Sequence, residues 1–114
     1  MYDHSWQWHL RHAYRTAEDL IDALALPRGT LALESEFPLL ATRPFVERME
    51  KGNPRDPLLL QILPQARETE DVAGYTRDPL DESSHVQGSG IIHKYHGRLL
   101  LVTTGACAVN CRYC

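Results

Sequence analysis

The chain is organised around the stretch Cys107-Ala108-Val109-Asn110-Cys111-Arg112-Tyr113-Cys114. This cysteine loop holds all three cysteines of the chain, in a C-x3-C-x2-C pattern. An odd number of clustered cysteines does not suit a disulfide framework, whereas neighbouring thiolates in a reducing compartment bind metals or clusters. The spacing therefore indicates a metal or cluster site, and the upstream residues are interpreted as the scaffold that leads into it.

Length and composition indicate one small globular domain. The 114 residues are 43% hydrophobic and 24% charged, with a formal net charge of −3 and no run rich in Lys and Arg, so no nucleic-acid partner is predicted. The longest apolar runs are far shorter than the roughly 20 residues of a membrane-spanning helix. The N-terminus carries no secretory signal pattern. We therefore expect a cytoplasmic protein with neither nucleic acid nor membrane as a partner.

Helical patterns dominate the first half of the chain. Residues 6–25 carry apolar side chains at three- and four-residue spacing, which predicts helix, and a capping-box-like pair at Thr16 and Asp19 predicts a restart within it. A second helix begins near Pro44 and stops at Gly52. A third, short and buried helix begins after Asp56, whose side chain is predicted to cap it.

The second half of the chain changes from loop to strand. Residues 65–90 show no clear periodicity, and Asp78 is interpreted there as a turn residue rather than a catalytic acid. Residues 91–95 and 98–104 predict a β-hairpin around the turn His96-Gly97. The second strand is continuously apolar, which is typical of a strand buried on both faces. The cysteine loop would then follow the C-terminal end of a buried strand, where active sites of α/β proteins collect.

Two kinds of site suit the cysteine loop. A structural zinc site needs four closed ligands, so it would add a histidine chosen from His85, His93 or His96. A 4Fe–4S cluster held by three cysteines would instead keep one iron open for a small molecule. An open coordination position distinguishes catalytic from structural metal centres, and this favours the cluster. The alternative function is a small structural zinc-binding Cys/His module.

The loop resembles the signature of radical S-adenosylmethionine enzymes, which is C-x3-C-x2-C with an aromatic residue before the last cysteine. Its flanking motifs resemble the lysine 2,3-aminomutase family, and the wording Ala-Val-Asn-Cys-Arg-Tyr-Cys is most similar to the branch that acts in elongation factor P modification. The motifs that carry the resemblance are Asn53-Pro54-Arg55-Asp56-Pro57-Leu58, Asp78-Pro79-Leu80-Asp81-Glu82, His93-Lys94-Tyr95-His96-Gly97-Arg98 and residues 104–114.

The resemblance implies an L-lysine 2,3-aminomutase that converts (S)-α-lysine to (R)-β-lysine by a 1,2-amino shift. It implies a 4Fe–4S cluster, S-adenosyl-L-methionine and pyridoxal 5′-phosphate as cofactors, and an external electron donor. It also implies a functional link to elongation factor P and its lysyl-tRNA-synthetase-like ligase, which attaches the β-lysine. The cofactors would perform the radical chemistry, while the protein orients the reacting groups.

Residue roles follow from the same resemblance. It makes Cys107, Cys111 and Cys114 the cluster ligands and puts Tyr113 near the adenine of S-adenosylmethionine. The resemblance further puts Tyr95 and Arg98 near pyridoxal phosphate, where a cation pairs with the phosphate. The alternative for these two residues is hairpin packing and a solvated charge. No catalytic residue is assigned within the chain.

The fold implied is α/β: an N-terminal helical accessory segment over residues 1–90, then residues 91–114 as the hairpin and first strand of a partial (β/α)6 radical S-adenosylmethionine barrel. The family's remaining barrel would lie beyond residue 114. We therefore expect the chain to be an N-terminal fragment, itself mainly α with a short hairpin, and inactive as an aminomutase on its own.

Overall fold

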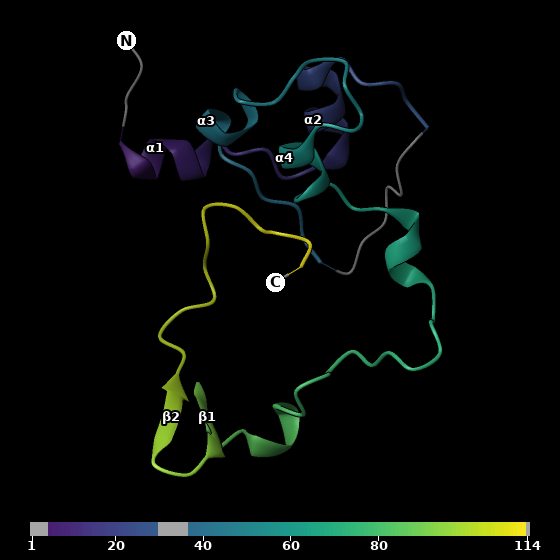
Figure 1. The fold of residues 1–114 in the computed structure, drawn as a ribbon. Coiled ribbons are helices and arrows are strands. Elements are labelled where there is room, and N and C mark those ends of the chain that lie inside the picture. Colours follow the sequence, from purple (N-terminus) through teal and green to yellow (C-terminus); the bar gives the residue numbers. More distant parts are fainter. Residues whose placement is uncertain (1–4, 30–36, 114) are drawn as a thin grey trace. The chain divides into compact units, whose positions relative to one another are not determined.

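A computed structural model describes residues 5–29 and 37–113 and divides the chain into two units (Figure 1). The helical unit contains the described residues of Met1–Thr69 and of Cys107–Cys114, and the hairpin unit is Glu70–Ala106. The cysteine loop therefore belongs with the helices rather than with the strand that precedes it. The predicted boundary between the accessory segment and the barrel, at residue 91, falls inside the hairpin unit. Because that boundary concerns the domains of a longer protein, it stays a prediction.

Two short helices occupy the segment for which one helix was predicted. Helix α1 is Trp6–Arg11 and helix α2 is Ala17–Leu24. The prediction of helix over residues 6–25 is wrong for the residues between α1 and α2, where Tyr14 instead forms an antiparallel bridge with Ala41. The predicted restart is confirmed: the Thr16 hydroxyl accepts a hydrogen bond from the Asp19 amide at 3.1 Å and caps α2.

Helix α3 is Arg43–Val46 and helix α4 is Pro57–Leu60. α3 is shorter than predicted, because turns replace the helix before Gly52. The cap of α4 is confirmed, since the Asp56 carboxylate accepts hydrogen bonds from the Leu58 amide at 2.9 Å and the Leu59 amide at 3.1 Å. Burial of α4 is confirmed only on one side: Leu59 is fully buried, whereas Leu60 is exposed.

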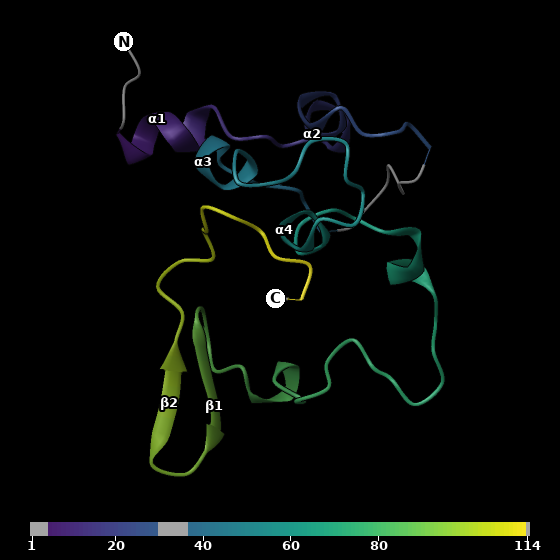
Figure 2. The same cartoon turned by 45° about the horizontal axis from the view of Figure 1, so that its top comes forward.

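The helical unit has one hydrophobic core. Its members come from α2, α3, α4 and the segments between and after these helices: Ala17, Leu20, Ile21, Leu24, Leu26, Leu39, Ala41, Val46, Met49, Leu59, Ile62 and Leu63. Figure 2 shows the segment after residue 106, in yellow, running past α3 and α4 in the same unit. Val109 from this segment packs against the core, so the cysteine loop shares the helices' hydrophobic packing.

Ala41 lies at the centre of a small backbone ladder. It forms an antiparallel bridge with Tyr14 on one side and with Val109 on the other. The Tyr14 amide donates to the Ala41 carbonyl at 2.8 Å, and the Ala41 amide donates back at 3.0 Å. Ala41 itself is fully buried. The ladder therefore joins three segments that are far apart in sequence.

The hairpin unit contains strand β1, Ile91–Tyr95, and strand β2, Arg98–Leu101, which pair antiparallel. This confirms the predicted hairpin and its turn, but β2 ends earlier than residue 104. The predicted loop over residues 65–90 contains two 3-10 helices, η1 at Ala66–Thr69 in the helical unit and η2 at Ser83–His85. No helix in the described part of the chain has the length and apolarity that crossing a membrane requires.

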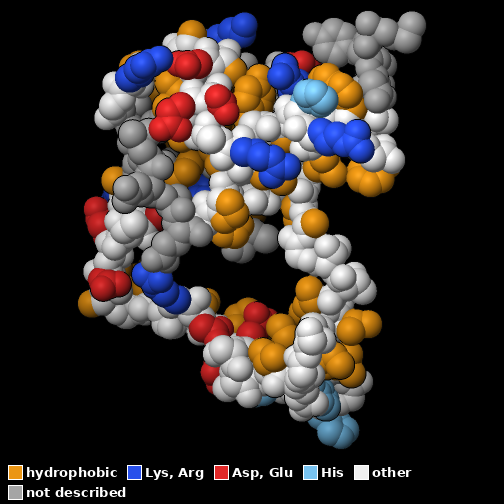
Figure 3. All heavy atoms as spheres, turned by 180° about the vertical axis from the view of Figure 1, so that it is seen from behind, with side chains coloured by type: hydrophobic (Ala, Val, Ile, Leu, Met, Phe, Trp, Pro, Cys, Tyr) orange, Lys and Arg blue, Asp and Glu red, His pale blue; other side chains and the backbone are white. Residues whose placement is uncertain are grey.

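The prediction that the second strand is buried on both faces is wrong for this chain. Leu99, Leu100 and Leu101 are exposed to 59%, 53% and 60%. Strand β2 pairs with β1 alone in a two-stranded sheet, and a two-stranded hairpin has no second layer with which to bury its faces. Hydrophobic side chains consequently gather on the surface of the hairpin unit, at the lower right of Figure 3.

Candidate functional site

The cysteine loop presents two described thiols. Cys107 is exposed and Cys111 is half-buried, and both are free of disulfides. Cys114 lies outside the described residues, so the predicted set of three ligands stays a prediction. Within residues 5–29 and 37–113, no three His, Cys, Asp or Glu side chains form a metal-binding group.

Backbone hydrogen bonds hold the loop on the helical unit on both sides of Cys111. The Asn110 amide donates to the Leu40 carbonyl at 2.9 Å, and the Arg112 amide donates to the Gln61 carbonyl at 2.7 Å. These two amides immediately precede and follow Cys111. The backbone that carries this thiol is therefore fixed by two different segments of the helical unit.

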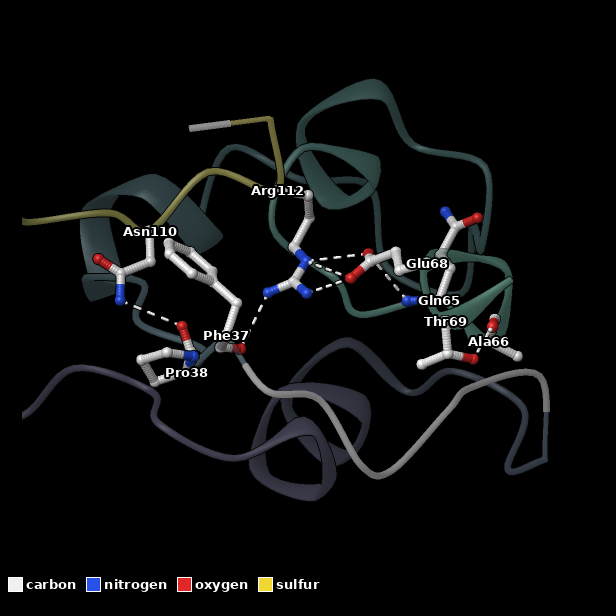
Figure 4. A network of polar contacts seen from close by, with 8 residues as sticks. All are labelled: Phe37, Pro38, Gln65, Ala66, Glu68, Thr69, Asn110 and Arg112. Carbon is white, nitrogen blue, oxygen red and sulfur yellow. Dashed lines mark hydrogen bonds and ion pairs between the residues drawn. The ribbon is translucent and has the colours of Figure 1, made fainter. Parts of the chain in front are cut away.

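Two side chains of the loop reach back to the segment that begins at Phe37 (Figure 4). Asn110 Nδ2 donates to the Pro38 carbonyl at 3.1 Å, and Arg112 Nη1 donates to the Phe37 carbonyl at 3.0 Å. Arg112 Cζ also lies 5.2 Å from the centroid of the Phe37 ring, a cation–π distance. Both polar residues of the motif thus have structural partners.

Arg112 also forms a bidentate ion pair with Glu68 in η1. Its Nε donates to both carboxylate oxygens, at 2.9 Å and 3.1 Å, and its Nη2 contacts Oε2. The same carboxylate accepts the Gln65 amide at 3.1 Å. Hydrogen bonding from the Arg112 guanidinium lowers the pKa of Glu68 below its ordinary value. The pair therefore connects η1 with the cysteine loop.

The donor set of the loop fits a thiophilic metal or an iron–sulfur cluster. Cys107 and Cys111 are uncommitted soft ligands on one loop whose backbone is already anchored. Their exposure leaves room for a group to approach. The cysteines would hold such a cluster, and the anchored backbone would orient the Cys111 sulfur.

Tyr113 is 76% exposed beside the last cysteine of the motif. An exposed aromatic side chain next to a cluster loop suits stacking on a flat ligand such as an adenine. Its assignment to S-adenosylmethionine stays a prediction.

Tyr95 and Arg98 lie together at the turn of the hairpin. Arg98 Cζ is 4.6 Å from the centroid of the Tyr95 ring, and Lys94 Nζ is 5.6 Å from the same ring. These three residues line an open groove together with Glu82. The contact between Tyr95 and Arg98 is a packing contact within the hairpin. The proximity of these two residues to pyridoxal phosphate stays a prediction.

Asp78 is a turn residue, as predicted. Its carboxylate accepts the Glu82 amide at 3.0 Å and the Ser83 amide at 2.9 Å. Hydrogen bonding from the Ser83 side chain, followed by these amides, lowers the pKa of Asp78 to about 2. The Asp78 carboxylate therefore closes the turn before η2. Because it is held in its ionised form, it is poorly suited to donate a proton.

Three residues that position the loop were not singled out from the sequence. Asn110 and Arg112 entered only as part of the loop wording that carries the resemblance, and Glu68 entered only within the loop predicted over residues 65–90. The ion pair spans 44 residues, and no local spacing rule pairs residues at that separation. The polar spacers inside the motif were the available signal, because a polar residue between metal ligands needs partners of its own.

No protein-family model matches the chain, but several curated proteins are similar to it. An L-lysine 2,3-aminomutase of Haemophilus influenzae is 39% identical over 116 residues, covering 98% of this chain and 34% of that protein. An L-lysine 2,3-aminomutase of Escherichia coli is 53% identical over 78 residues, covering 68% of this chain and 22% of that protein. An L-lysine 2,3-aminomutase of Bacillus subtilis is 32% identical, covering 96% of this chain and 24% of that protein. The chain therefore spans at most about a third of the length of these relatives.

Proposed function

We propose a function for this chain from one premise: it belongs to the lysine 2,3-aminomutase family. The chain is the cluster-binding N-terminal segment of a radical S-adenosylmethionine L-lysine 2,3-aminomutase. The complete enzyme converts (S)-α-lysine to (R)-β-lysine. The observation that carries the proposal is the anchored cysteine loop, in which hydrogen-bonded amides bracket Cys111 and the described thiols stay free.

The proposed cofactors are a 4Fe–4S cluster, S-adenosylmethionine and pyridoxal phosphate. When bound, they supply a carbon radical that starts the amino shift, with an external donor providing the electron. The chain's own part is to hold the cluster through Cys107, Cys111 and Cys114 and to present Tyr113 to the nucleoside. Tyr95 and Arg98 contribute an aromatic and cationic surface suited to a phosphate-bearing ring.

The proposed fold of the complete enzyme is a partial (β/α)6 barrel in which β2 is the first strand. Three consecutive exposed leucines in β2 support this, because a strand with apolar side chains on both faces is suited to the interior of a parallel sheet. These 114 residues by themselves then lack aminomutase activity. Turnover of L-lysine to β-lysine by the isolated chain, supplied with all three cofactors and a reductant, would contradict that statement.

The proposed physiological role is supply of (R)-β-lysine for modification of elongation factor P by its lysyl-tRNA-synthetase-like ligase. The loop wording Ala-Val-Asn-Cys-Arg-Tyr-Cys supports this role. Mass spectrometry of elongation factor P from cells with and without the gene tests it. The β-lysyl mass should disappear in the deletion strain and return when β-lysine is supplied; an unchanged mass would exclude the role.

Anaerobic reconstitution with iron and sulfide tests the cluster. The wild-type chain should gain broad visible absorbance and four irons per chain, the number in a 4Fe–4S cluster. Cys107→Ala and Cys111→Ala should each lose that capacity, while Ser84→Ala, a substitution in the hairpin unit, should retain it. Stoichiometric, colourless zinc in place of iron would instead support a structural Cys/His module.

A further inference from the structure

We infer that the helical unit forms the cysteine loop before any cluster binds, and that Arg112 is the positioning residue that holds it. The inference deepens the proposed function and rests on it for the identity of the group bound. Its own content is a property of the cluster-free chain: protein contacts alone already hold the loop backbone on both sides of Cys111. The observations that carry it are the contacts of Asn110 and Arg112 (Figure 4).

The loop separates the residues that hold it from the residues that would bind. Val109 pairs with Ala41 and packs on the core, while Asn110 and Arg112 bind the helical unit through both their amides and their side chains. The described cysteines alternate with these anchors and keep free thiols. Holding the loop therefore consumes none of the described ligands.

Arg112 is the anchor that joins two separate segments at once. Its guanidinium donates to the Glu68 carboxylate and to the Phe37 carbonyl, and its side chain is only 10% exposed. A planar guanidinium with five donors satisfies this arrangement, whereas a lysine ammonium is a single point charge on a flexible stem. The geometry thus calls for arginine at this position and predicts that lysine will not replace it fully.

Preformation has a thermodynamic consequence for cluster binding. A loop that must be ordered during binding pays the entropy of ordering out of the binding free energy. A loop already held by protein contacts avoids that cost. Removing the contacts of the Arg112 guanidinium should therefore reduce retention of the cluster, even though Arg112 is not a ligand.

Hydrogen exchange of the cluster-free, 114-residue chain, followed by NMR, tests preformation directly. The Asn110 and Arg112 amides should be protected in the wild type, and Arg112→Gln should reduce that protection about tenfold, which corresponds to about 1.4 kcal/mol. The matched control is Arg28→Gln, which removes an exposed ion pair with Asp22 and should leave both amides unchanged. Unprotected loop amides in the wild type, or equal protection in Arg112→Gln, would overturn the inference.

Folding of each variant is checked in the same spectra. The Leu63 amide, which donates to the Leu59 carbonyl at 3.0 Å, reports the core and should keep its protection in Arg112→Gln. If both the core amide and the loop amides lose protection, Glu68→Gln serves as a second variant, because it removes the negative charge of the ion pair and leaves Arg112 in place. The double variant Glu68→Gln/Arg112→Gln should lose no more loop protection than Arg112→Gln alone; strictly additive losses would exclude a single coupled clamp.

The rate at which the reconstituted chain loses iron distinguishes a positioning role of Arg112 from a purely structural one. After reconstitution, Arg112→Gln should release iron to a chelator about tenfold faster than the wild type at an unchanged melting temperature, with Arg112→Lys intermediate. Equal release rates would overturn the positioning role. If the wild type binds no iron–sulfur cluster, the proposed function fails, while the exchange experiment still decides whether the loop is preformed.

Discussion

Arg112 and Glu68, 44 residues apart in the chain, form a bidentate ion pair between the cysteine loop and the 3-10 helix η1. The pair lies at 10% side-chain exposure for Arg112 and 34% for Glu68, so solvent screens it only in part. It acts together with the Arg112 amide, which donates to the Gln61 carbonyl. The loop is consequently held by residues that are not themselves predicted ligands.

Acid should release this clamp. The pKa of Glu68 is lowered below its ordinary 4.5 because Arg112 hydrogen-bonds its ionised form. A lowered folded-state pKa contributes stability that is present above pH 4.5 and is lost as the pH falls through the folded-state value. Loop-amide protection in the cluster-free chain should therefore decrease on acidification below that pH. In Glu68→Gln the loss of loop-amide protection on acidification should be smaller. An identical loss in this variant would show that other carboxylates cause it.

Removing the cap of α4 should destabilise the helical unit. The buried Asp56 carboxylate accepts the Glu50 amide at 3.0 Å as well as the amides of Leu58 and Leu59. Loss of an N-cap costs about 0.5–2 kcal/mol, so Asp56→Ala should lower the free energy of unfolding by an amount in that range in a urea titration. Asp56→Asn retains one carbonyl acceptor and should lose less. Equal losses in both variants would show that the charge, rather than the cap geometry, matters.

Gly90 should be required at the open end of the hairpin, away from the turn at His96-Gly97. The φ of Gly90 is +76°, and a Cβ added there would lie 2.8 Å from the Val102 carbonyl oxygen. The Val102 amide also donates to the Gly90 carbonyl at 2.7 Å. Gly88 has φ +73° but open space around it, so Gly88→Ala carries the backbone strain without the clash. Gly90→Ala should therefore lose more protection of the Val102 amide than Gly88→Ala. Equal losses would attribute the whole effect to backbone strain.

Ser83 should control the ionisation of Asp78. The pKa of Asp78 is about 2, and hydrogen bonding from the Ser83 side chain is its largest cause. Ser83→Ala should raise this pKa towards the ordinary 3.8, as measured by NMR titration of the carboxyl carbon. Ser84→Ala is the control, because the Ser84 hydroxyl donates to the Asp81 carbonyl instead. A midpoint unchanged in Ser83→Ala would refute the assignment of cause.

Features that depend on neighbouring residues could be predicted from the sequence. The caps at Thr16 and Asp56, the hairpin turn and the turn role of Asp78 all follow from side chains within a few positions of the backbone they serve. Spacing alone also identified the cysteine loop as the candidate site. The cap and turn predictions succeed because capping and turn formation are local hydrogen-bonding events, whereas the ligand role of the cysteine loop stays a prediction.

Features that depend on distant residues could not be predicted. The break before Thr16 exists because Tyr14 pairs with Ala41, and helical periodicity does not record such a partner. Burial of β2 was inferred from its apolar run, but burial depends on what packs against a strand rather than on the strand itself. Arg112 was given no structural role for the same reason, since its partner Glu68 is set by the tertiary fold.

The ladder at Ala41 also determines the order in which the helical unit can be completed during synthesis. A chain emerges from the ribosome N-terminus first, so Tyr14 and Ala41 are available long before Val109, which supplies the last bridge. Until then the neighbouring Leu40 carbonyl lacks the Asn110 amide that it later accepts, and an unpaired backbone edge is the kind of surface that recruits wrong partners. The helical unit therefore closes late, and its final closure brings the cysteine loop into place on helices that have already emerged.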